Sequence, residues 1–497
     1  SPRTDRDVIY DQCIADLQEA VELLPWQGEA NAPSTPERFC KNSAYGILAR
    51  VALYAAGYSL RWDLNTYDPS TLHIAQRSDA ARVKELYQIA ADACKAVIEK
   101  RQNGLLDNYD QLFRDLGNQT YNKETMLEYG WYGENSADVR TGYVNGIPTS
   151  GNDNSEGGMG KGGSQMMTFP TLFFDFDKDD QRRDVSVSNY GIVLSAKGNK
   201  YQMNAYNGMG VGKYRINWKK DMGATNSKRN INFPLLRYAD VLLMYAEALN
   251  EVNNGPTQEA INAVKEVRKR AFRGNEAKAA AGIPTNHDDF LTFIQKERKL
   301  ELSNEGLRRT DLTRWGKQYE MLMAAKQRLI DLAKRDGEFA NVPVYRAYYL
   351  STTPKFEDPT IALSYIDLSQ ADVEALGLSA DQIKTLKILN SSSKGSLKDV
   401  KLYEKDGKLY SAVNKPEGAV EHSYTILNMF SIVSIKQKGN LCVEDVTGVS
   451  SNNAWITGNS GVFYGLQKNM TELMPFNTSK ILDVNAGLEG QQHPAYK

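Results

Sequence analysis

Two segments between Phe233 and Gly316 constrain the fold of this 497-residue chain more than any other part of it. The first reads FPLLRYADVLLMYAEALNEVNN, and its apolar residues recur at roughly the helical period, which predicts a packed helix from Leu235 to Val252. The second reads QKERKLELSNEGLRRTDLTRWG and interleaves apolar residues with charge in the same way. Both segments therefore predict helices that pack against neighbours.

Charged residues are set into both helical patterns. They are Arg237, Asp240 and Glu247 in the first segment and Glu297, Arg298, Glu301, Glu305 and Asp311 in the second. The first three share one stripe of the predicted helix, and the three glutamates follow one another at i,i+4 spacing. A charge run is usually a solvated face of an amphipathic helix. Because apolar residues interleave with the charges in both segments, an ion-pair network between helices is the stronger interpretation here.

Three motifs stand in order in this part of the chain: the first segment, then AINAVKEVRKRA from Ala260 to Ala271, then the second segment. The opening SPRTDRDVIYDQCIADLQEAVELLP and the closing ELMPFNTSKILDVNAGLEGQQHPAYK add two more. Together these motifs resemble those of the SusD family, whose members are surface glycan-binding lipoproteins of Bacteroidetes-type bacteria. The resemblance covers both ends and the middle, whereas residues 117–230 and 317–468 match the family pattern loosely or not at all.

The resemblance implies a predominantly α-helical fold: a scaffold of tetratricopeptide-like helical hairpins, with long irregular excursions and a small β-containing insertion. It implies non-catalytic binding of oligosaccharide or polysaccharide at the cell surface, and delivery to a SusC-like TonB-dependent transporter of the outer membrane. The family's signal, acylated cysteine and N-terminal helical portion have no match in this sequence, so we expect the chain to be the C-terminal portion of such a protein. Membrane attachment would then depend on a lipid anchor that is absent from this chain.

The helical pattern and its interruptions predict four regions. Residues 1–116 hold amphipathic helices that resemble tetratricopeptide hairpins, although no strict repeat is present. Residues 117–232 are an excursion rich in aromatic residues, glycine and asparagine, without a sustained helix. Residues 233–335 carry the motif helices, and residues 336–497 combine a mixed module containing β-hairpins with the family-like tail.

Charge and cysteine content argue against several classes of protein. The formal net charge is -1 and no long run of one sign occurs, so a nucleic-acid partner is not expected. The four cysteines have neither CxxC nor Cys/His ligand spacing, and we expect neither a metal nor a cofactor. Their default interpretation is that of small buried hydrophobic residues, with a Cys13–Cys40 disulfide open if the compartment is oxidising.

The excursion at 117–232 is where we expect the glycan to bind. Sugars present apolar C–H faces ringed by hydroxyl groups, so their sites need an exposed aromatic platform beside amides, carboxylates and guanidinium groups. The segment YGWYGENSADVRTGY supplies all of these. The candidate ligand-binding residues are Trp131, Tyr132, Tyr143, Tyr121, Arg140, Asn135 and Trp218. The alternative is that Tyr129 and Trp131 alternate on a strand and simply pack on the helices.

Two shorter patterns predict local structure outside the helices. The glycine-rich run GNDNSEGGMGKGGS at 151–164 satisfies G-x-G-x-x-G. No buried strand precedes it and no clear helix follows, so a mobile surface loop is expected instead of a phosphate site. The run KLYEKDGKLY at 401–410 places Asp-Gly between two β-prone stretches, which predicts a hairpin.

Two other functions compete with glycan binding. A glycosidase needs two carboxylates about 5 to 10 Å apart, and the stripe of Glu297, Glu301 and Glu305 offers about the lower end of that separation. Arginines crowd this stripe and would keep its carboxylates ionised and paired, so catalysis is not expected. The second alternative is a helical-repeat scaffold or adaptor that binds protein, and burial of Trp131 and its neighbours against helices would favour it.

Overall fold

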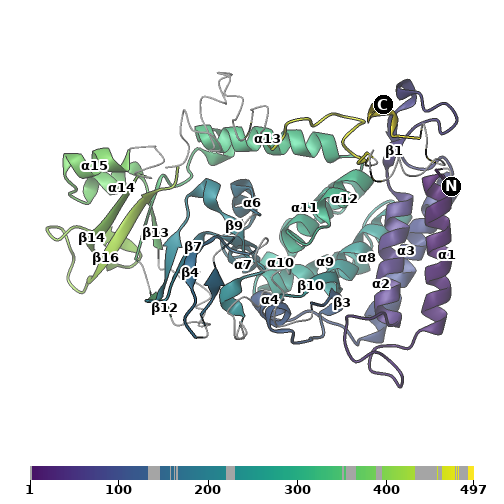
Figure 1. Cartoon of the computed structure of the whole chain (residues 1–497), viewed down its shortest axis with the longest axis horizontal. Helices are drawn as coiled ribbons and strands as arrows, with labels where there is room; N and C mark the ends of the chain where they lie inside the picture. The colour runs from purple at the N-terminus through teal and green to yellow at the C-terminus, as the bar shows by residue number, and fades with distance from the viewer. Residues whose placement is uncertain are drawn as a thin grey trace.

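The computed structural model describes residues 3–131, 146–156, 158–161, 163, 166–219, 230–349, 352–353, 365–387, 395–430, 456, 462–475, 477, 480, 488 and 491–496. Within them the chain is predominantly helical, and two five-stranded sheets accompany the helices. The predicted fold class, a SusD-like helical scaffold, is therefore confirmed. Figure 1 shows the N-terminal helices, in purple, at one end of the molecule and a protruding sheet, in green, at the other.

Antiparallel helices form the scaffold. They are α1 (Arg6–Leu23), α2 (Lys41–Ala56), α3 (Ala80–Lys100), α8 (Tyr238–Asn253), α9 (Gln258–Ala271) and α11 (His287–Glu301). Helix α2 packs between α1 and α3, and α3 packs on α8 (Figure 1). Ala49, Ala52 and Ala56 of α2 are fully buried, because side chains this small let the neighbouring helices approach closely. The periodicity of the sequence predicted these helices to within a few residues.

The helix expected from Leu235 begins only at Tyr238. Residues Phe233–Arg237 form strand β10, which pairs antiparallel with β3 (Thr125–Tyr129). The backbone of Arg237 is extended, with φ -128° and ψ 155°. Pairing with β3 satisfies the backbone groups of this stretch, and Arg237 therefore does not share a helical stripe with Asp240 as predicted.

The i,i+4 series of glutamates is also shorter than predicted. Helix α11 ends at Glu301, and Glu305 lies in the turn that follows. Asn304 and Gly306 flank it with φ angles of 62° and 80°. Left-handed residues of this kind terminate a helical path, so Glu305 reaches its partners from a turn.

The stretch predicted as irregular contains most of a sheet. Its strands, in the order β12-β8-β7-β4-β5, are Thr352–Thr353, Asn199–Met203, Tyr190–Ser195, Thr149–Asp153 and Gly160–Lys161. The glycine-rich run therefore forms β4 and β5 where it is described, and Gly158 and Gly160 are buried. The expected mobile surface loop is wrong for these residues, because β4 pairs in parallel with β7 and buries one end of the run.

A second sheet forms the protruding module. Its strands, in the order β13-β11-β16-β14-β15, are Tyr365–Leu368, Tyr345–Tyr348, Val420–Asn428, Ser396–Lys405 and Lys408–Tyr410. The predicted hairpin is confirmed: Lys405 pairs with Lys408, and Asp406 and Gly407 have φ angles of 51° and 71°. Two short helices, α14 (Gln370–Ala375) and α15 (Ala380–Leu386), accompany this sheet.

Shorter elements connect these bodies. The helices are α4 (Tyr109–Asn118), α6 (Pro170–Asp175), α7 (Arg182–Ser186), α10 (Glu276–Ala280), α12 (Arg308–Arg314) and α13 (Gln318–Lys334). The strands are β1 (Ser59–Arg61) paired with β2 (His73–Ala75), and β6 (Val187–Ser188) paired with β9 (Gly210–Val211). Both chain ends lie at the same end of the molecule, beside β1 (Figure 1). None of the described helices is long and apolar enough to cross a lipid bilayer.

The cysteines differ from their default interpretation at one position. Cys40 and Cys94 are buried, whereas Cys13 is exposed on α1. All three are free thiols, so the Cys13–Cys40 disulfide is not formed. Cys442 lies outside the described residues.

Candidate functional site

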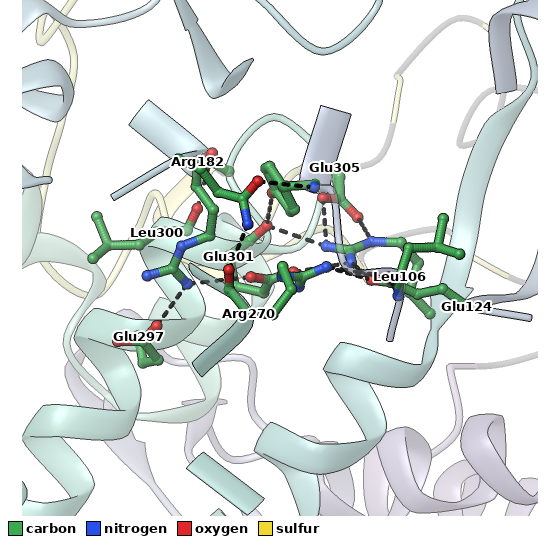
Figure 2. A network of polar contacts seen from close by, with 12 residues as sticks. Leu106, Glu124, Arg182, Arg270, Glu297, Leu300, Glu301 and Glu305 are labelled. Atoms are coloured by element: carbon green, nitrogen blue, oxygen red, sulfur yellow. Dashed lines mark hydrogen bonds and ion pairs between the residues drawn. The ribbon is translucent and has the colours of Figure 1, made fainter. Parts of the chain in front are cut away.

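The eight charged residues predicted to form ion pairs in the two motif segments are buried, and the structure gathers them into two ion-pair clusters. The first cluster joins strand, turn and helix (Figure 2). Arg237 donates to Glu124 at 2.7 Å, to Glu301 at 3.0 Å and to Glu305 at 2.7 Å. Arg270 binds Glu124 and Glu301 from α9, at 3.1 and 2.7 Å. Strand β10, helix α9 and helix α11 are thereby fixed to one another.

Two further cations complete the first cluster from the sheet side. Arg182 of α7 contacts Glu297 at 2.6 Å and Glu301 at 3.2 Å. Lys213 contacts Glu305 at 2.6 Å, and burial lowers the pKa of its ammonium group to about 8. These contacts tie α7 and the segment after Val211 to the helical scaffold.

The second cluster lies along α8 and α12. Asp240 binds Arg298 at 2.6 Å, and Arg298 binds Asp311 at 2.9 Å. Glu247 accepts hydrogen bonds from Arg314 at 2.8 Å and from the Trp315 indole at 2.9 Å. Buried polar groups without partners are costly, so each charge here depends on the others.

The carboxylates of both clusters are bound by cations. Burial alone would raise the pKa of Glu301, but Arg270, Arg237 and Arg182 hold it well below the usual range. Burial opposes ionisation of Asp240 as well, and Arg298 and Arg50 lower its pKa. A carboxylate that stays ionised and hydrogen-bonded cannot donate a proton to a glycosidic oxygen, so these clusters are suited to holding the scaffold together.

A pair of aromatic rings lies at the end of β3, on the surface. Tyr129 is 52% exposed, and its ring meets the partly buried ring of Trp131 edge to face, with centroids 4.7 Å apart. Tyr121 is also exposed, and its hydroxyl donates to Glu37 at 2.9 Å. Strand β3 ends at Tyr129, and Trp131 lies two residues beyond it.

Short polar side chains hold this pair in place. The backbone N–H of Trp131 donates to Asn232 at 3.2 Å, and its carbonyl accepts from Gln119 at 2.7 Å. Asn232 in turn donates to Glu128 at 2.9 Å. These contacts fix the backbone of Trp131, and Asn232 and Glu128 are themselves buried.

Glu128 is the least favourably placed carboxylate of this group. Its side chain is almost fully buried, and burial raises its pKa to about 7. Asn232 donates to it at 2.9 Å, and this hydrogen bond lowers the pKa less than burial raises it. The nearby charges of Glu37 and Asp115 raise the same pKa further.

The structure places the predicted ligand-binding residues in different environments. Trp131 and Tyr121 lie together near Tyr129, as described above. Trp218 is 3% exposed, with the guanidinium groups of Arg114 and Arg215 at 4.6 and 4.7 Å from its ring centroid, so it offers no free face for a sugar. The remaining candidates lie outside the described residues: Tyr132, Asn135, Arg140 and Tyr143.

Three residues of the aromatic site were not among the predicted candidates. Tyr129 was considered only as a packing residue, although its alternation with Trp131 was visible in the sequence. Asn232 directly precedes the first motif segment, a position that could have drawn attention to it. Glu37 is distant in sequence and carries no local signal. Among the described residues, no group of histidine, cysteine, aspartate and glutamate could hold a metal ion.

Comparison with known proteins finds a matching family model and several similar proteins. A family model described as "SusD family" matches residues 107–374. SusD-like protein P2 of Formosa agariphila is 28% identical over 325 residues, which are 63% of this chain and 57% of that protein. SusD-like protein P25 of the same organism is 27% identical over 354 residues, which are 63% of this chain and 56% of that protein. The chain therefore spans less than two thirds of the length of these curated relatives.

A solved structure gives the same result for the fold. The crystal structure of a SusD homolog from Bacteroides thetaiotaomicron superposes with a TM-score of 0.55 at 26% sequence identity. The match covers 66% of this chain and 62% of that one. With the family model matching more than half of its residues, and with both motif segments buried in one shared scaffold, this chain belongs to the SusD family.

Proposed function

We propose that this protein binds glycans at the cell surface without catalysis and delivers them to a SusC-like TonB-dependent transporter in the outer membrane. The observation that carries the proposal is the exposed ring of Tyr129, which meets the Trp131 ring edge to face, beside the exposed pair of Tyr121 and Glu37. Membership of the SusD family supports the glycan as ligand class. Membership of the family also supports the transporter as partner and attachment to the outer-membrane surface through a lipid anchor.

The sugar would stack its apolar C–H face on Tyr129 while its hydroxyl groups exchange hydrogen bonds with neighbouring polar side chains. Glu37 and Tyr121 lie on the exposed side and are already joined by one hydrogen bond. A hydroxyl group both donates and accepts, so it can insert into such a pair without leaving either partner unsatisfied. Trp131 would act chiefly by holding the Tyr129 ring in its orientation.

Isothermal titration against a panel of polysaccharides tests the proposal, with wild type compared with Tyr129→Ala. Aromatic stacking contributes about 0.5–1.5 kcal/mol beyond the buried area, so the variant should raise Kd roughly 2- to 13-fold. Tyr464→Ala is the matched control, because Tyr464 is 68% exposed and has no part in this site. Absence of binding to every glycan, or equal affinity of wild type and Tyr129→Ala, would contradict the proposal.

A further inference from the structure

Two cations meet at the junction of α11, α12 and α13. Arg308 begins α12, Lys317 directly precedes α13, and both contact Gln295 of α11. The Arg308 guanidinium donates to the backbone carbonyl of Gln295 at 3.0 Å, and the Lys317 ammonium donates to the Gln295 side chain at 3.2 Å. Figure 1 shows this junction well apart from β3, which leads to the aromatic site at Tyr129.

Neither cation has a carboxylate partner. Among the described residues, Arg308 and Lys317 form no ion pair, although both side chains are partly buried. Burial lowers the pKa of Arg308 to about 10, since the nearby charges of Asp311 and Asp175 compensate only in part. A charge that leaves water is stable when paired ions or hydrogen bonds replace the lost hydration. Arg308 therefore lacks the counter-ion that its burial requires.

The carboxylates near Arg308 are already bound to other cations. Asp311 pairs with Arg298 and Arg314 at 2.9 Å each, and Asp175 pairs with Lys299 at 2.7 Å and Arg328 at 2.8 Å. Lys299 belongs to the same positive region, because the charge of Arg308 adds to the effect of burial in lowering its pKa. These pairs leave the charge of Arg308 and Lys317 uncompensated.

The side-chain amide of Gln295 adds an unsatisfied donor. Gln295 is 7% exposed, and its Nε2 has no hydrogen-bond partner in the part of the chain that the structure describes. An ammonium group can only donate, so Lys317 must face the oxygen of this amide and leave its N–H groups for another acceptor. Buried N–H groups without an acceptor are rare in native proteins. An anion bound beside the amide would satisfy it and neutralise the two cations.

The start of α13 adds to the positive potential. Lys317 is the N-cap of this 17-residue helix, and no side chain caps its first N–H groups. The amino-terminal end of a helix carries a partial positive charge that favours anions. Glu320, the acidic residue of the first turn, is paired with Lys468 at 2.8 Å. The junction thus combines free donors with an excess of positive charge.

We propose that this junction binds one oxyanion, a sulfate or phosphate group, through Arg308, Lys317 and the Nε2 group of Gln295. A guanidinium group suits such a ligand, because its parallel N–H groups bind two oxygens at once. The oxyanion is either a free inorganic ion or the sulfate substituent of a saccharide. Only the second source rests on the proposed glycan binding.

Equilibrium dialysis with radiolabelled sulfate, and separately with radiolabelled phosphate, tests the site at constant ionic strength. We expect saturable binding of one ion per chain. Arg308→Met and Lys317→Met each remove a charged hydrogen bond and should weaken binding roughly tenfold or more. Near-ultraviolet circular dichroism checks that each variant is folded, and the more exposed position of a helix N-cap makes Lys317→Met the safer of the two.

Arg335→Met is the matched control. Arg335 also donates to one backbone carbonyl, that of Ala340 at 3.4 Å, and it forms no ion pair within the described part of the chain. It lies at the opposite end of α13, as its C-cap. Arg335→Met should therefore leave sulfate and phosphate binding unchanged.

Competition identifies the source of the oxyanion. Displacement of labelled sulfate by glucose 6-sulfate, but not by glucose, supports a sulfated saccharide, whereas displacement by inorganic phosphate alone supports a free ion. Absence of saturable binding of both ions overturns the site, and so does an equal loss of binding in Arg308→Met and Arg335→Met. Because the aromatic site is tested with Tyr129→Ala, which leaves this junction intact, failure of one proposal does not entail failure of the other.

Discussion

Removal of Arg237 should destabilise the protein far more than removal of a surface arginine. Its guanidinium group is 1% exposed and makes five hydrogen bonds, to Glu124, Glu301 and Glu305. In Arg237→Met these carboxylates remain buried, and among the described residues Glu305 keeps Lys213 as its charged partner. Breaking a buried ion pair by removing one partner costs about 3–5 kcal/mol.

The control is Arg82→Met. Arg82 is 23% exposed and pairs with Asp11 and Glu85, whose side chains are 38% and 60% exposed. Surface pairs of this kind contribute about 0–1 kcal/mol, because water and salt screen them. The two variants therefore differ in burial and not in the type of residue removed.

Urea unfolding followed by near-ultraviolet circular dichroism measures the difference. For a chain of this size the denaturant slope exceeds about 3 kcal/mol/M, so Arg237→Met should lower the midpoint by about 1 M. The double variant Arg237→Met with Glu305→Gln should recover part of the loss, because it removes one of the stranded charges. Equal midpoints for Arg237→Met and Arg82→Met would refute the view that the carboxylates depend on Arg237.

Two further predictions concern single positions. Burial raises the folded-state pKa of Glu128 to about 7, above its unfolded value of 4.5. The unfolded state therefore loses its proton first, and wild type should lose roughly 3 kcal/mol relative to Glu128→Gln between pH 4.5 and 7. Urea midpoints of both proteins at pH 5 and pH 8 measure this, and parallel pH profiles would contradict it. Gly57→Ala should cost about 1–3 kcal/mol, because its new methyl group would lie 2.6 Å from the backbone oxygen of Arg314. A thermal melt equal to that of wild type would show that α2 and α12 can move apart at this contact.

The long helices were predictable because their signal is local. Apolar residues at a regular period predicted helices in residues 1–116 and in the motif segments, where the structure has α1, α3 and α8. The start of α8 was not predictable in this way. Arg237 belongs to a strand because β3, more than a hundred residues earlier in the chain, supplies its hydrogen-bonding partner. A periodic pattern cannot report such a distant partner.

The sheet at 149–203 escaped prediction for the same reason. Strand β4 reads TSGND and carries no β-prone residue beyond its threonine, yet it pairs in parallel with β7. The edge strand Thr352–Thr353 joins β8 from far along the chain. Within the aromatic site, Trp131 and Tyr121 could be named because their segment is rich in aromatic residues, whereas Glu37 approaches Tyr121 only through tertiary structure.

The ion pairs around Glu301 also bear on the order in which the chain folds. Their members come from α7, α9, α11, β10 and the segment before β3, so the cluster is complete only when all five have arrived. Until then each charge is more stable in water, because a partly assembled core would bury ions that have no partner. We therefore expect these ion pairs to form after the folding transition state. Chains whose elements have docked incorrectly could not form them. Stopped-flow kinetics of Arg237→Met should then show faster unfolding with a nearly unchanged folding rate.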